Sequence, residues 1–481
     1  MPISPAYRPD PRFAALGPEF ADAVTPAAFP KEVLRFRNQR AASSVGLDTL
    51  TEAEWLAHFA RFEPLPENQP GPLAMRYHGH QFRVYNPDLG DGRGFLFAQL
   101  REAGPAGRLL DLGTKGSGRT PWSRDGDGRL TLKGAVREVL ATAMLEALGV
   151  PTSRSFSMVE TGEGLERGDE PSPTRSAVLT RLSWCHIRFG TFQRHAALQR
   201  PDLVGQLLGH VIGAYYPQLE GAEDPAAALL AAVVARAAQL TAAWMAAGFV
   251  HGVLNTDNMN ITGESFDYGP YRFLPRNDPN FIAAYFDHTG LYSFGRQPEA
   301  VFWNLQQLAG ALTAVSDTEP LVEALNTFGP AYRDALAAAM VARLGLGPAG
   351  PAADVDLANA AFRALAEGGE PLRWEPFFFD WFGGADDRAM GGPRAAHYGG
   401  DAFRAFRALL AGRTADRPQH LAHPYFARPE PEELLYDEIE TIWAAIANHD
   451  DWGPFEAKLA SIESAREGWD LAIAPHPSSA G

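Results

Sequence analysis

The spacing of hydrophobic and polar positions divides the chain into a strand-rich part followed by a helical part. Between about residues 72 and 185, runs of β-branched and aromatic residues alternate with glycine clusters, which predicts strands. Beyond Asp202 the apolar positions recur every three or four residues, which predicts helices. These helices are expected at 202–219, 225–247, 299–316, 320–343, 354–367, 402–412 and 431–447. The pattern therefore predicts an α+β fold in which the strands precede most of the helices.

The longest apolar run begins at Ala226, in the second of these helices. Asp224 is a preferred N-cap residue, and Pro225 suits the first position of a helix. The run is rich in alanine and is interrupted by Arg236. It therefore predicts a buried helix of the core rather than a membrane span.

One helix is predicted inside the strand-rich part, at about 131–148, and Gly149 marks its end. Its apolar residues share one face, and Glu138 falls on the opposite side. Periodicity alone would place Glu138 in water. A strand lysine followed by a helical glutamate, here Lys115 and Glu138, is also the ion pair that positions phosphates in kinase-like folds.

Two glycine clusters follow predicted strands, at Gly90–Gly94 and at Gly116–Gly118. The first is either a plain hairpin turn, which is the default interpretation, or a loop whose backbone N–H groups bind an anion. In the second interpretation Arg93 adds a charged hydrogen bond. Lys115 directly precedes the second cluster, at the end of a predicted strand.

The composition makes one group of basic residues stand out. A net charge of -16 and a pI near 5.3 argue against general binding of nucleic acids or anionic membranes. The segment 115–137 nevertheless holds many more basic than acidic residues, namely Lys115, Arg119, Arg124, Arg129, Lys133 and Arg137. This group is either a phosphate-sized positive pocket or an ordinary solvated face. A strand predicted at 176–192 adds Arg181 and Arg188, which bind phosphate oxygens or form structural ion pairs.

The segment His251–Gly269 carries the strongest candidate chemistry. Its pattern predicts two short strands around a turn at Gly263, with Asp257 and Asn258 before one strand and Asp267 after the other. Such a hairpin would bring the three polar side chains together. Hard oxygen ligands of this kind suit Mg²⁺ or Mn²⁺ together with substrate phosphates. The alternative is that these residues only form turns.

Cysteine and histidine usage excludes other kinds of site. Cys185 is the only cysteine, so no intrachain disulfide is expected, and we interpret it as a small buried residue rather than a nucleophile. His78, His80 and His186 match no zinc-binding spacing, so a transition-metal site is not expected. The first twelve residues lack the apolar core of a signal peptide.

The order of these parts is that of protein kinases, a strand-rich lobe followed by a helical lobe with the metal ligands. We therefore expect a bilobal protein-kinase-like fold. It comprises an N-terminal extension (1–71), a nucleotide-binding N-lobe (72–185), a helical C-lobe (186–350) and a helical C-terminal extension (351–481). The aromatic cluster Trp374–Phe382 is expected to pack the last third of the chain onto the body. One departure from kinases is clear, because kinases use D-x-x-x-x-N, whereas Asp257 and Asn258 are adjacent.

With this departure the chain resembles the selenoprotein O family, kinase-like proteins that act as protein adenylyltransferases. The motifs that carry the resemblance span most of residues 30–310. They are Tyr77–Phe82, Leu89–Arg93, Lys115–Gly118, Ser123–Arg129, His186–Gly190, His251–Met259 and Phe266–Pro270. The resemblance implies that ATP binds in a flipped orientation relative to kinases and that AMP, rather than phosphate, is transferred to protein hydroxyls.

The resemblance also implies a role for each matching residue. Asp257 would be the proton acceptor, Asn258 and Asp267 the metal ligands, and Glu138 the partner of Lys115. The nucleotide would be bound by Gly90, Gly92, Arg93, Lys115, Asp127, Gly128, Arg181, Arg188 and Asp267. The metal would be Mg²⁺ or Mn²⁺, and ATP the co-substrate.

We accordingly expect a cytoplasmic, monomeric protein adenylyltransferase whose partners are ATP and proteins with Ser, Thr or Tyr hydroxyls, without nucleic acid or membrane. The alternatives are UMP transfer from UTP, a conventional protein kinase and a non-catalytic nucleotide-binding scaffold. Members of the family commonly carry a redox-active Cys or selenocysteine near the C-terminus, whereas this sequence has HPSSAG at 476–481. Redox control through that tail is therefore not expected.

Overall fold

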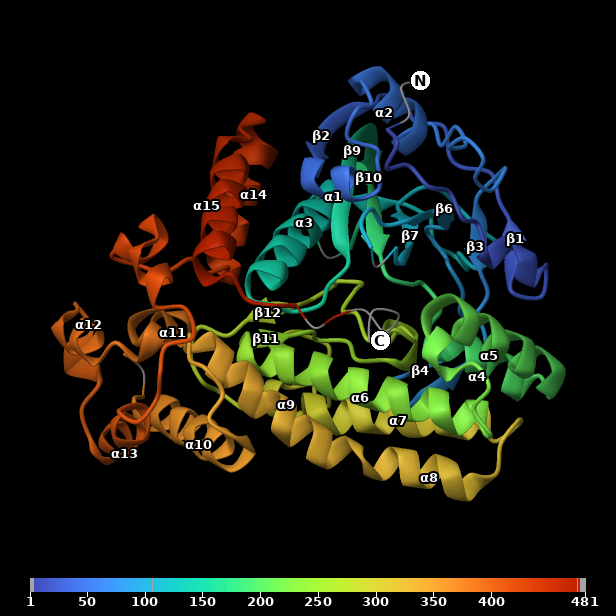
Figure 1. Cartoon of the computed structure of the whole chain (residues 1–481). Helices are drawn as coiled ribbons and strands as arrows, with labels where there is room; N and C mark the ends of the chain where they lie inside the picture. The colour runs from blue at the N-terminus through green and yellow to red at the C-terminus, as the bar shows by residue number, and fades with distance from the viewer. Residues whose placement is uncertain (1–3, 106, 169, 370, 474, 476–481) are drawn as a thin grey trace.

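The computed structural model describes residues 4–105, 107–168, 170–369, 371–473 and 475, and its main sheet is antiparallel and curled (Figure 1). The strand order is β1-β3-β6-β7-β10-β9-β2, with β8 paired to β10 outside this path. The strands are β1 (Ala21–Ala23), β2 (Val33–Arg37), β3 (Leu73–Met75), β6 (Leu96–Arg101), β7 (Leu109–Lys115), β8 (Leu130–Thr131), β9 (Arg154–Leu165) and β10 (Thr174–Ser183). Two further antiparallel pairs are β4 (Gly79–Gln81) with β5 (Val84–Asn86), and β11 (Phe249–Val250) with β12 (Arg272–Phe273). The tail 476–481, on which the redox expectation rests, lies outside the described residues.

Strand β7 is buried along its whole length because both faces of the sheet are covered. On one face Leu109 joins a core that includes helix α3 (Leu132–Ala147). On the other face Leu110 joins a core built with α1 (Gln39–Ser44) and α2 (Glu52–Phe59). The segment before residue 72 therefore supplies β1, β2 and one covering layer of the sheet.

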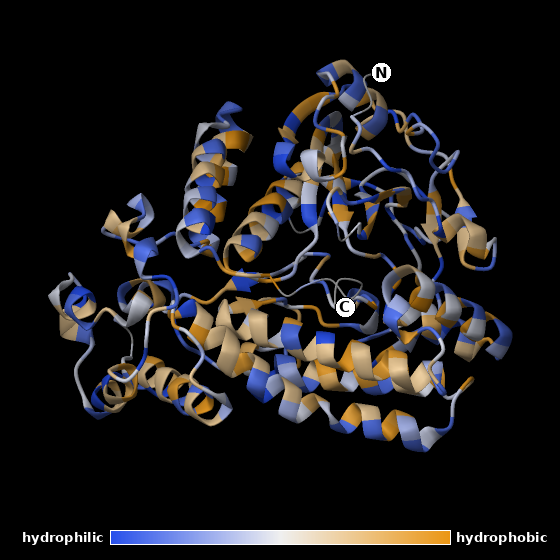
Figure 2. Cartoon of the chain, viewed as in Figure 1, coloured by the Kyte–Doolittle hydropathy of each residue, from blue (hydrophilic) through white to orange (hydrophobic). Residues whose placement is uncertain are grey.

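A layer of helices lies beneath the sheet in Figure 1. It contains α4 (Phe189–Ala197), α5 (Pro201–Tyr215), α6 (Pro225–Ala246), α7 (Gln297–Leu312), α8 (Thr318–Asn326) and α9 (Phe328–Arg343). Asp224 caps α6 as predicted, because its Oδ1 accepts hydrogen bonds from the backbone N–H groups of Ala226 and Ala227 at 3.0 Å. The hydropathy colouring in Figure 2 shows that α6 is apolar along most of its length. Within the described residues, α6 is the one helix long and apolar enough to cross a membrane, and 56% of its most apolar window is buried inside the protein.

The last third of the chain forms two groups of helices. Helices α10 (Pro351–Glu367), α11 (Trp374–Trp381), α12 (Asp386–Gly391) and α13 (Asp401–Leu410) lie at one side of the molecule (Figure 1). Helices α14 (Tyr436–His449) and α15 (Gly453–Trp469) lie beside α3. The predicted packing role of the aromatic cluster is confirmed, because the backbone N–H of Trp374 donates to Pro275 O at 3.0 Å and its ring contacts Phe294.

The predictions of one helix at 320–343 and of a strand at 176–192 were wrong. The helix expected at 320–343 is two helices, α8 and α9, because Pro330 in the first turn of α9 has no N–H to donate to Asn326. The strand expected at 176–192 ends at Ser183, and α4 starts at Phe189. Helix α4 escaped prediction because its first residues, Phe189–Phe192, continue a run of aromatic and β-branched residues of the kind that predicts a strand.

Candidate functional site

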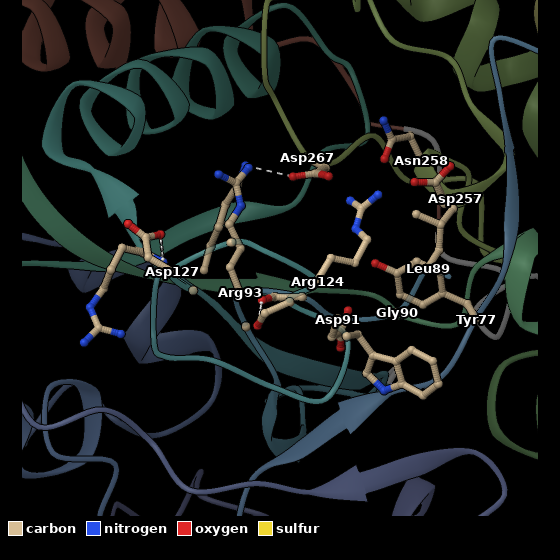
Figure 3. A pocket seen from close by; sticks show the side chains of 18 of the residues that line it. Tyr77, Leu89, Gly90, Asp91, Arg93, Arg124, Asp127, Asp257, Asn258 and Asp267 are labelled. Carbon is tan, nitrogen blue, oxygen red and sulfur yellow. Dashed lines mark hydrogen bonds and ion pairs between the residues drawn. The ribbon is translucent and has the colours of Figure 1, made fainter. Parts of the chain in front are cut away.

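A cleft of about 740 Å³ brings together residues from both halves of the chain. It is lined by Gly90, Gly92, Arg93, Lys115, Asp127, Gly128, Arg181, Arg188, Asp257, Asn258 and Asp267. Glu138, the remaining candidate, lies behind Lys115 and has no exposed surface. Figure 3 shows Asp257 and Asn258 together at one end of the cleft, Asp127 towards the other end, and Asp267 between them.

The predicted hairpin around Gly263 is not present, although its three polar side chains do line one cleft. The residues on the two sides of the turn pair with different parts of the chain. Asn260 forms a bridge with Arg188, and Ser265 forms one with Thr152. Because its partners are distant in sequence, the segment does not fold back on itself. Asp257 lies on a single 3-10 turn, Thr256–Asn258.

Lys115 links helix α3 to the His251–Gly269 segment through two carboxylates. Its Nζ lies 2.7 Å from Glu138 Oε2 and 2.8 Å from Asp267 Oδ1. Arg181 faces the same two carboxylates at 3.4 and 3.6 Å. Burial acts to raise the pKa of Asp267, but Lys115 and Arg181 hold that pKa well below its usual range. Asp267 is therefore an ionised carboxylate at neutral pH.

Asp257 is the carboxyl group in the cleft best suited to accept a proton. Burial raises the pKa of Asp257 to about 6, although the nearby Arg188 acts to lower it. Its Oδ1 is buried and has no hydrogen-bond partner among the described residues. A carboxylate with a raised pKa and an unused oxygen can serve as a general base near neutral pH.

Arg188 fixes the backbone at Asp257. Its Nη1 donates a 2.6 Å hydrogen bond to the carbonyl oxygen of Asp257, and its Nη2 lies 3.4 Å from Asp91 Oδ1. The guanidinium is held between two rings, 4.4 Å from the centroid of Tyr77 and 4.8 Å from that of Phe266. Stacking of this kind suits the planar guanidinium group and restricts its orientation.

The glycine cluster Gly90–Gly94 is not a hairpin turn, because β5 pairs with β4 whereas β6 pairs with β3 and β7. The default interpretation was therefore wrong, and the cluster is a connecting loop that lines the cleft. Gly90 is required for close packing, since a Cβ there would lie 2.3 Å from the ring of Trp122. The loop places Arg93 at the cleft wall.

The basic group at 115–137 does not form one positive pocket. Lys115, Arg124 and Arg129 line the cleft, and Figure 3 shows the guanidinium of Arg124 reaching between Asp267 and Asp257. Lys133 instead pairs with Glu440 of α14 at 2.7 Å, and Arg137 donates to backbone carbonyls, including that of Tyr271. The remaining cations of the cleft come from distant segments. They are Arg93, Arg167, Arg181 and Arg188.

Asp127 and Gly128 lie at the far end of the cleft from Asp257. The Asp127 carboxylate accepts the backbone N–H of Arg129 at 2.9 Å and pairs with Arg167 at 2.8 Å. Gly128 has φ +71°, and a Cβ there would lie 2.3 Å from the backbone of Gly118. Glycine is needed at this position because the two loops touch.

The histidines and the cysteine make other contacts. His78 Nδ1 bonds the hydroxyl of Tyr85 at 2.6 Å, and His80 Nδ1 accepts from Gln193 at 2.8 Å. His186 Nδ1 lies 3.3 Å from Asp111. The prediction that Cys185 is a buried residue is confirmed, and burial raises the pKa of its thiol well above the usual range.

A divalent cation would find oxygen donors at one place in this cleft. Asn258 Nδ2 donates to Val253 O at 3.0 Å, which orients the amide oxygen away from that bond. The ionised carboxylate of Asp267 and this amide oxygen are the hard donors that Mg²⁺ and Mn²⁺ prefer. Among the described residues, no group of three His, Cys, Asp or Glu side chains is placed to hold a metal, so such an ion would also need water or substrate oxygens.

Sequence reasoning missed several residues that shape the cleft. Asp91 accepts hydrogen bonds from Arg188 and from the backbone N–H of Met75, and Tyr77 stacks on Arg188. Asn255 lines the cleft two residues before Asp257. The position of Asp91 between two candidate glycines was a usable signal, whereas nothing in the local spacing indicated the contact between Tyr77 and Arg188.

Comparison with known proteins identifies the family of the chain. A family profile described as "Protein adenylyltransferase SelO" matches residues 6–390. The chain belongs to this family. It is 47% identical over 463 residues to the "Protein nucleotidyltransferase YdiU" of Gloeobacter violaceus, covering 93% of each chain. A protein of the same name from Synechocystis sp. is 44% identical over 484 residues, covering 95% of this chain and 98% of the relative. As a member of the SelO family, the chain is an enzyme, a nucleotidyltransferase.

Proposed function

We propose that the protein transfers AMP from ATP to Ser, Thr or Tyr hydroxyls of proteins, with ATP flipped relative to kinases. The observation that carries this proposal is the position of Asp257. Its unpaired Oδ1 and its pKa of about 6 put a general base in the same cleft as the cations Lys115, Arg181 and Arg188. Nucleotidyl transfer needs this combination, because a hydroxyl must lose a proton while charge develops on a phosphate.

In this proposal the nucleotide is bound by Gly90, Gly92, Arg93, Lys115, Asp127, Gly128, Arg181, Arg188 and Asp267. Glu138 keeps the Lys115 ammonium aligned, since the two groups are 2.7 Å apart and buried. Asn258 and Asp267 would hold Mg²⁺ or Mn²⁺, which would neutralise charge on the polyphosphate. Asp257 accepts the proton of the acceptor hydroxyl. The hydroxyl oxygen then forms a bond to the α-phosphorus while the bond to the pyrophosphate oxygen breaks.

We also propose that the architecture is a bilobal kinase-like fold with lobes at 72–185 and 186–350 and extensions at 1–71 and 351–481. The curled antiparallel sheet with helix α3, followed by a helical layer, supports this proposal. A monomer in the cytoplasm that acts on proteins is the setting we propose for the reaction. The overall charge of -16 supports protein rather than nucleic-acid partners.

The decisive experiment follows label from ATP carrying ³²P at either the α- or the γ-phosphate, with Mg²⁺ and a mixture of candidate proteins. AMP transfer predicts label from the α-position alone, and Asp267→Ala should abolish it. Label from the γ-position alone would contradict the proposal and indicate a kinase. The same assay with UTP labelled at the α-phosphate tests UMP transfer. Absence of label from all three labelled compounds would favour a non-catalytic scaffold.

A further inference from the structure

An exposed aromatic patch lies where two segments distant in sequence meet. It consists of Tyr285 and Phe286 from the segment before α7, and of Phe82, which is half-buried at the turn of the β4–β5 hairpin. The ring of Phe286 lies 5.9 Å from that of Phe82 and 5.1 Å from that of Tyr285. Tyr285 is 80% exposed and Phe286 41% exposed. The neighbouring apolar residues Val84 and Ile282 are exposed as well.

This aromatic patch is attached to the rim of the cleft through Asn255. The backbone N–H of Phe82 donates to Asn255 Oδ1 at 3.1 Å, and the hydroxyl of Tyr292 donates to the same oxygen at 2.8 Å. Asn255 lines the cleft, as does Gln81, the residue before Phe82. The patch is therefore continuous with the wall of the cleft.

The hairpin that carries Phe82 also touches the proposed general base. A Cβ added to Gly79 would lie 3.0 Å from Asp257 Oδ1, so the hairpin backbone packs directly against that carboxyl group. Phe82 and Arg83 are consecutive non-glycine residues with φ of +50° and +65°. They are the two central residues of the β4–β5 turn, and a two-residue type I′ turn requires positive φ at both of them.

Two arginines beside the patch pair with one carboxylate. Arg83 is paired with Glu299 at 2.9 Å, and Arg296 pairs with the same carboxylate at 3.2 Å. The two arginines share a single carboxylate, so their charge is only partly offset, while the patch itself offers aromatic rings. Burial of exposed aromatic rings against apolar side chains is energetically favourable. Aromatic residues are also enriched at the centres of protein interfaces.

We propose that the aromatic patch docks the protein substrate by binding apolar residues that flank the acceptor hydroxyl. The inference rests on the proposed transfer to protein hydroxyls, because such an acceptor must approach Asp257 from the solvent. A segment seated on Phe82, Tyr285 and Phe286 would enter the cleft beside Asn255 and present its hydroxyl to Asp257. The substrate class is thus a protein segment with apolar neighbours around the modified residue.

The test uses two fluorescein-labelled 13-residue peptides with a central serine. One carries Leu and Phe on both sides of the serine, and the other carries Gly and Asn there. Fluorescence anisotropy should show that the protein binds the apolar peptide about tenfold more tightly, which is the gain expected from burying one or two side chains. The double variant Tyr285→Ser/Phe286→Ser should lose this preference, and Tyr285→Ser alone should lose part of it.

Two controls separate docking from folding and from chemistry. The variant Leu198→Ser/Val322→Ser replaces two apolar residues of similar exposure, 49% and 47%, elsewhere on the surface, and it should keep the preference. The affinity for ATP should be the same in all variants. Equal or undetectable binding of the two peptides by the unmodified protein would overturn the docking proposal, as would a preference that survives the patch variant.

The same peptides distinguish failure of this proposal from failure of the proposed function. A binding preference without label from α-labelled ATP would count against AMP transfer and leave the docking surface standing. Equal labelling of both peptides would support AMP transfer and overturn the docking surface.

Discussion

Arg188 Nη1 donates a 2.6 Å hydrogen bond to the backbone carbonyl oxygen of Asp257. The guanidinium that makes this bond is stacked between Tyr77 and Phe266, so it has little freedom to move. The backbone position from which the Asp257 side chain extends is therefore fixed. This makes Arg188 a positioning residue for Asp257, the proposed general base, in addition to its proposed contact with the nucleotide.

Arg188→Lys should lower kcat about 10²-fold, because lysine keeps the charge but cannot stack and donate in the same geometry. Steady-state kinetics with α-labelled ATP would separate kcat from KM. Arg194→Lys is the matched control, since Arg194 also lies over an aromatic ring, that of Trp122, but does not line the cleft. A change in KM for ATP with unchanged kcat would contradict the positioning role.

The pH dependence of the reaction should report the pKa of Asp257. Because the base must be ionised, kcat/KM should fall as the pH drops through about 6, rather than through the ordinary range near 4. A rate profile between pH 4.5 and 8.5 would measure this limb. An acidic limb centred near pH 4 would contradict the assignment of Asp257 as a buried base.

Asp257→Asn should abolish transfer but stabilise the fold at high pH. The raised pKa means that the native state keeps a proton which the unfolded chain loses between about pH 4 and 6, so native stability falls over this range. Asparagine cannot ionise. We therefore expect the free energy of unfolding of the variant to exceed that of the wild type by about 1–3 kcal/mol at pH 8 and to equal it at pH 4. Thermal unfolding at the two pH values checks the sign, and equal gains at both would contradict the explanation.

Glu138→Gln should cost both activity and stability. Glu138 is fully buried and faces Lys115 and Arg181, so loss of its charge leaves two buried cations with Asp267 alone. We expect a loss of roughly 3 kcal/mol in the free energy of unfolding, together with weaker ATP binding. Denaturant titration and ATP affinity are the measurements.

The matched control for Glu138 is Glu146→Gln on the same helix. Glu146 pairs with Arg40, whose side chain is 44% exposed, and an ion pair open to solvent contributes little to stability. Equal losses in the two variants would mean that the effect belongs to the helix rather than to the Lys115 pair.

Glu264 should make the wild-type protein less stable as the pH rises from about 4.5 to 8. Burial raises the pKa of Glu264 to about 8, against the hydrogen bond that its carboxylate accepts from Trp184 N at 2.8 Å. The native carboxyl therefore holds a proton over this range while the unfolded one does not. Glu264→Gln should show a Tm advantage that grows up to pH 8 and then levels off. The exposed Glu323→Gln should show none.

Local patterns in the sequence were sufficient for some of the helices and their ends. Apolar residues at helical spacing and the Asp224–Pro225 start depend on neighbours within one turn, so the helix at 225–247 was predicted within a residue of α6. The motif residues were likewise recognisable without coordinates. Pro330 divides the helix predicted at 320–343, and this signal was present in the sequence but not used.

Long-range contacts decided the rest. The segment on either side of Gly263 had the sequence pattern of a hairpin. In the structure, however, Asn260 forms a β-bridge with Arg188, and Ser265 forms one with Thr152. Helical periodicity alone predicted that Glu138 is exposed to solvent. In the fold, the sheet places Lys115 beside Glu138, and both side chains are buried.

The sequence by itself determined the helical periodicity, the capping residues and the types of side chain available for chemistry, because each depends on residues close along the chain. Only the tertiary structure decided how the pKa values of the two carboxyl groups in the cleft differ. Asp257 is desolvated with an unpaired oxygen, whereas Asp267 is held ionised by Lys115 and Arg181. Burial and the distance to opposite charges set a pKa, and both arise from residues that meet only when the chain folds.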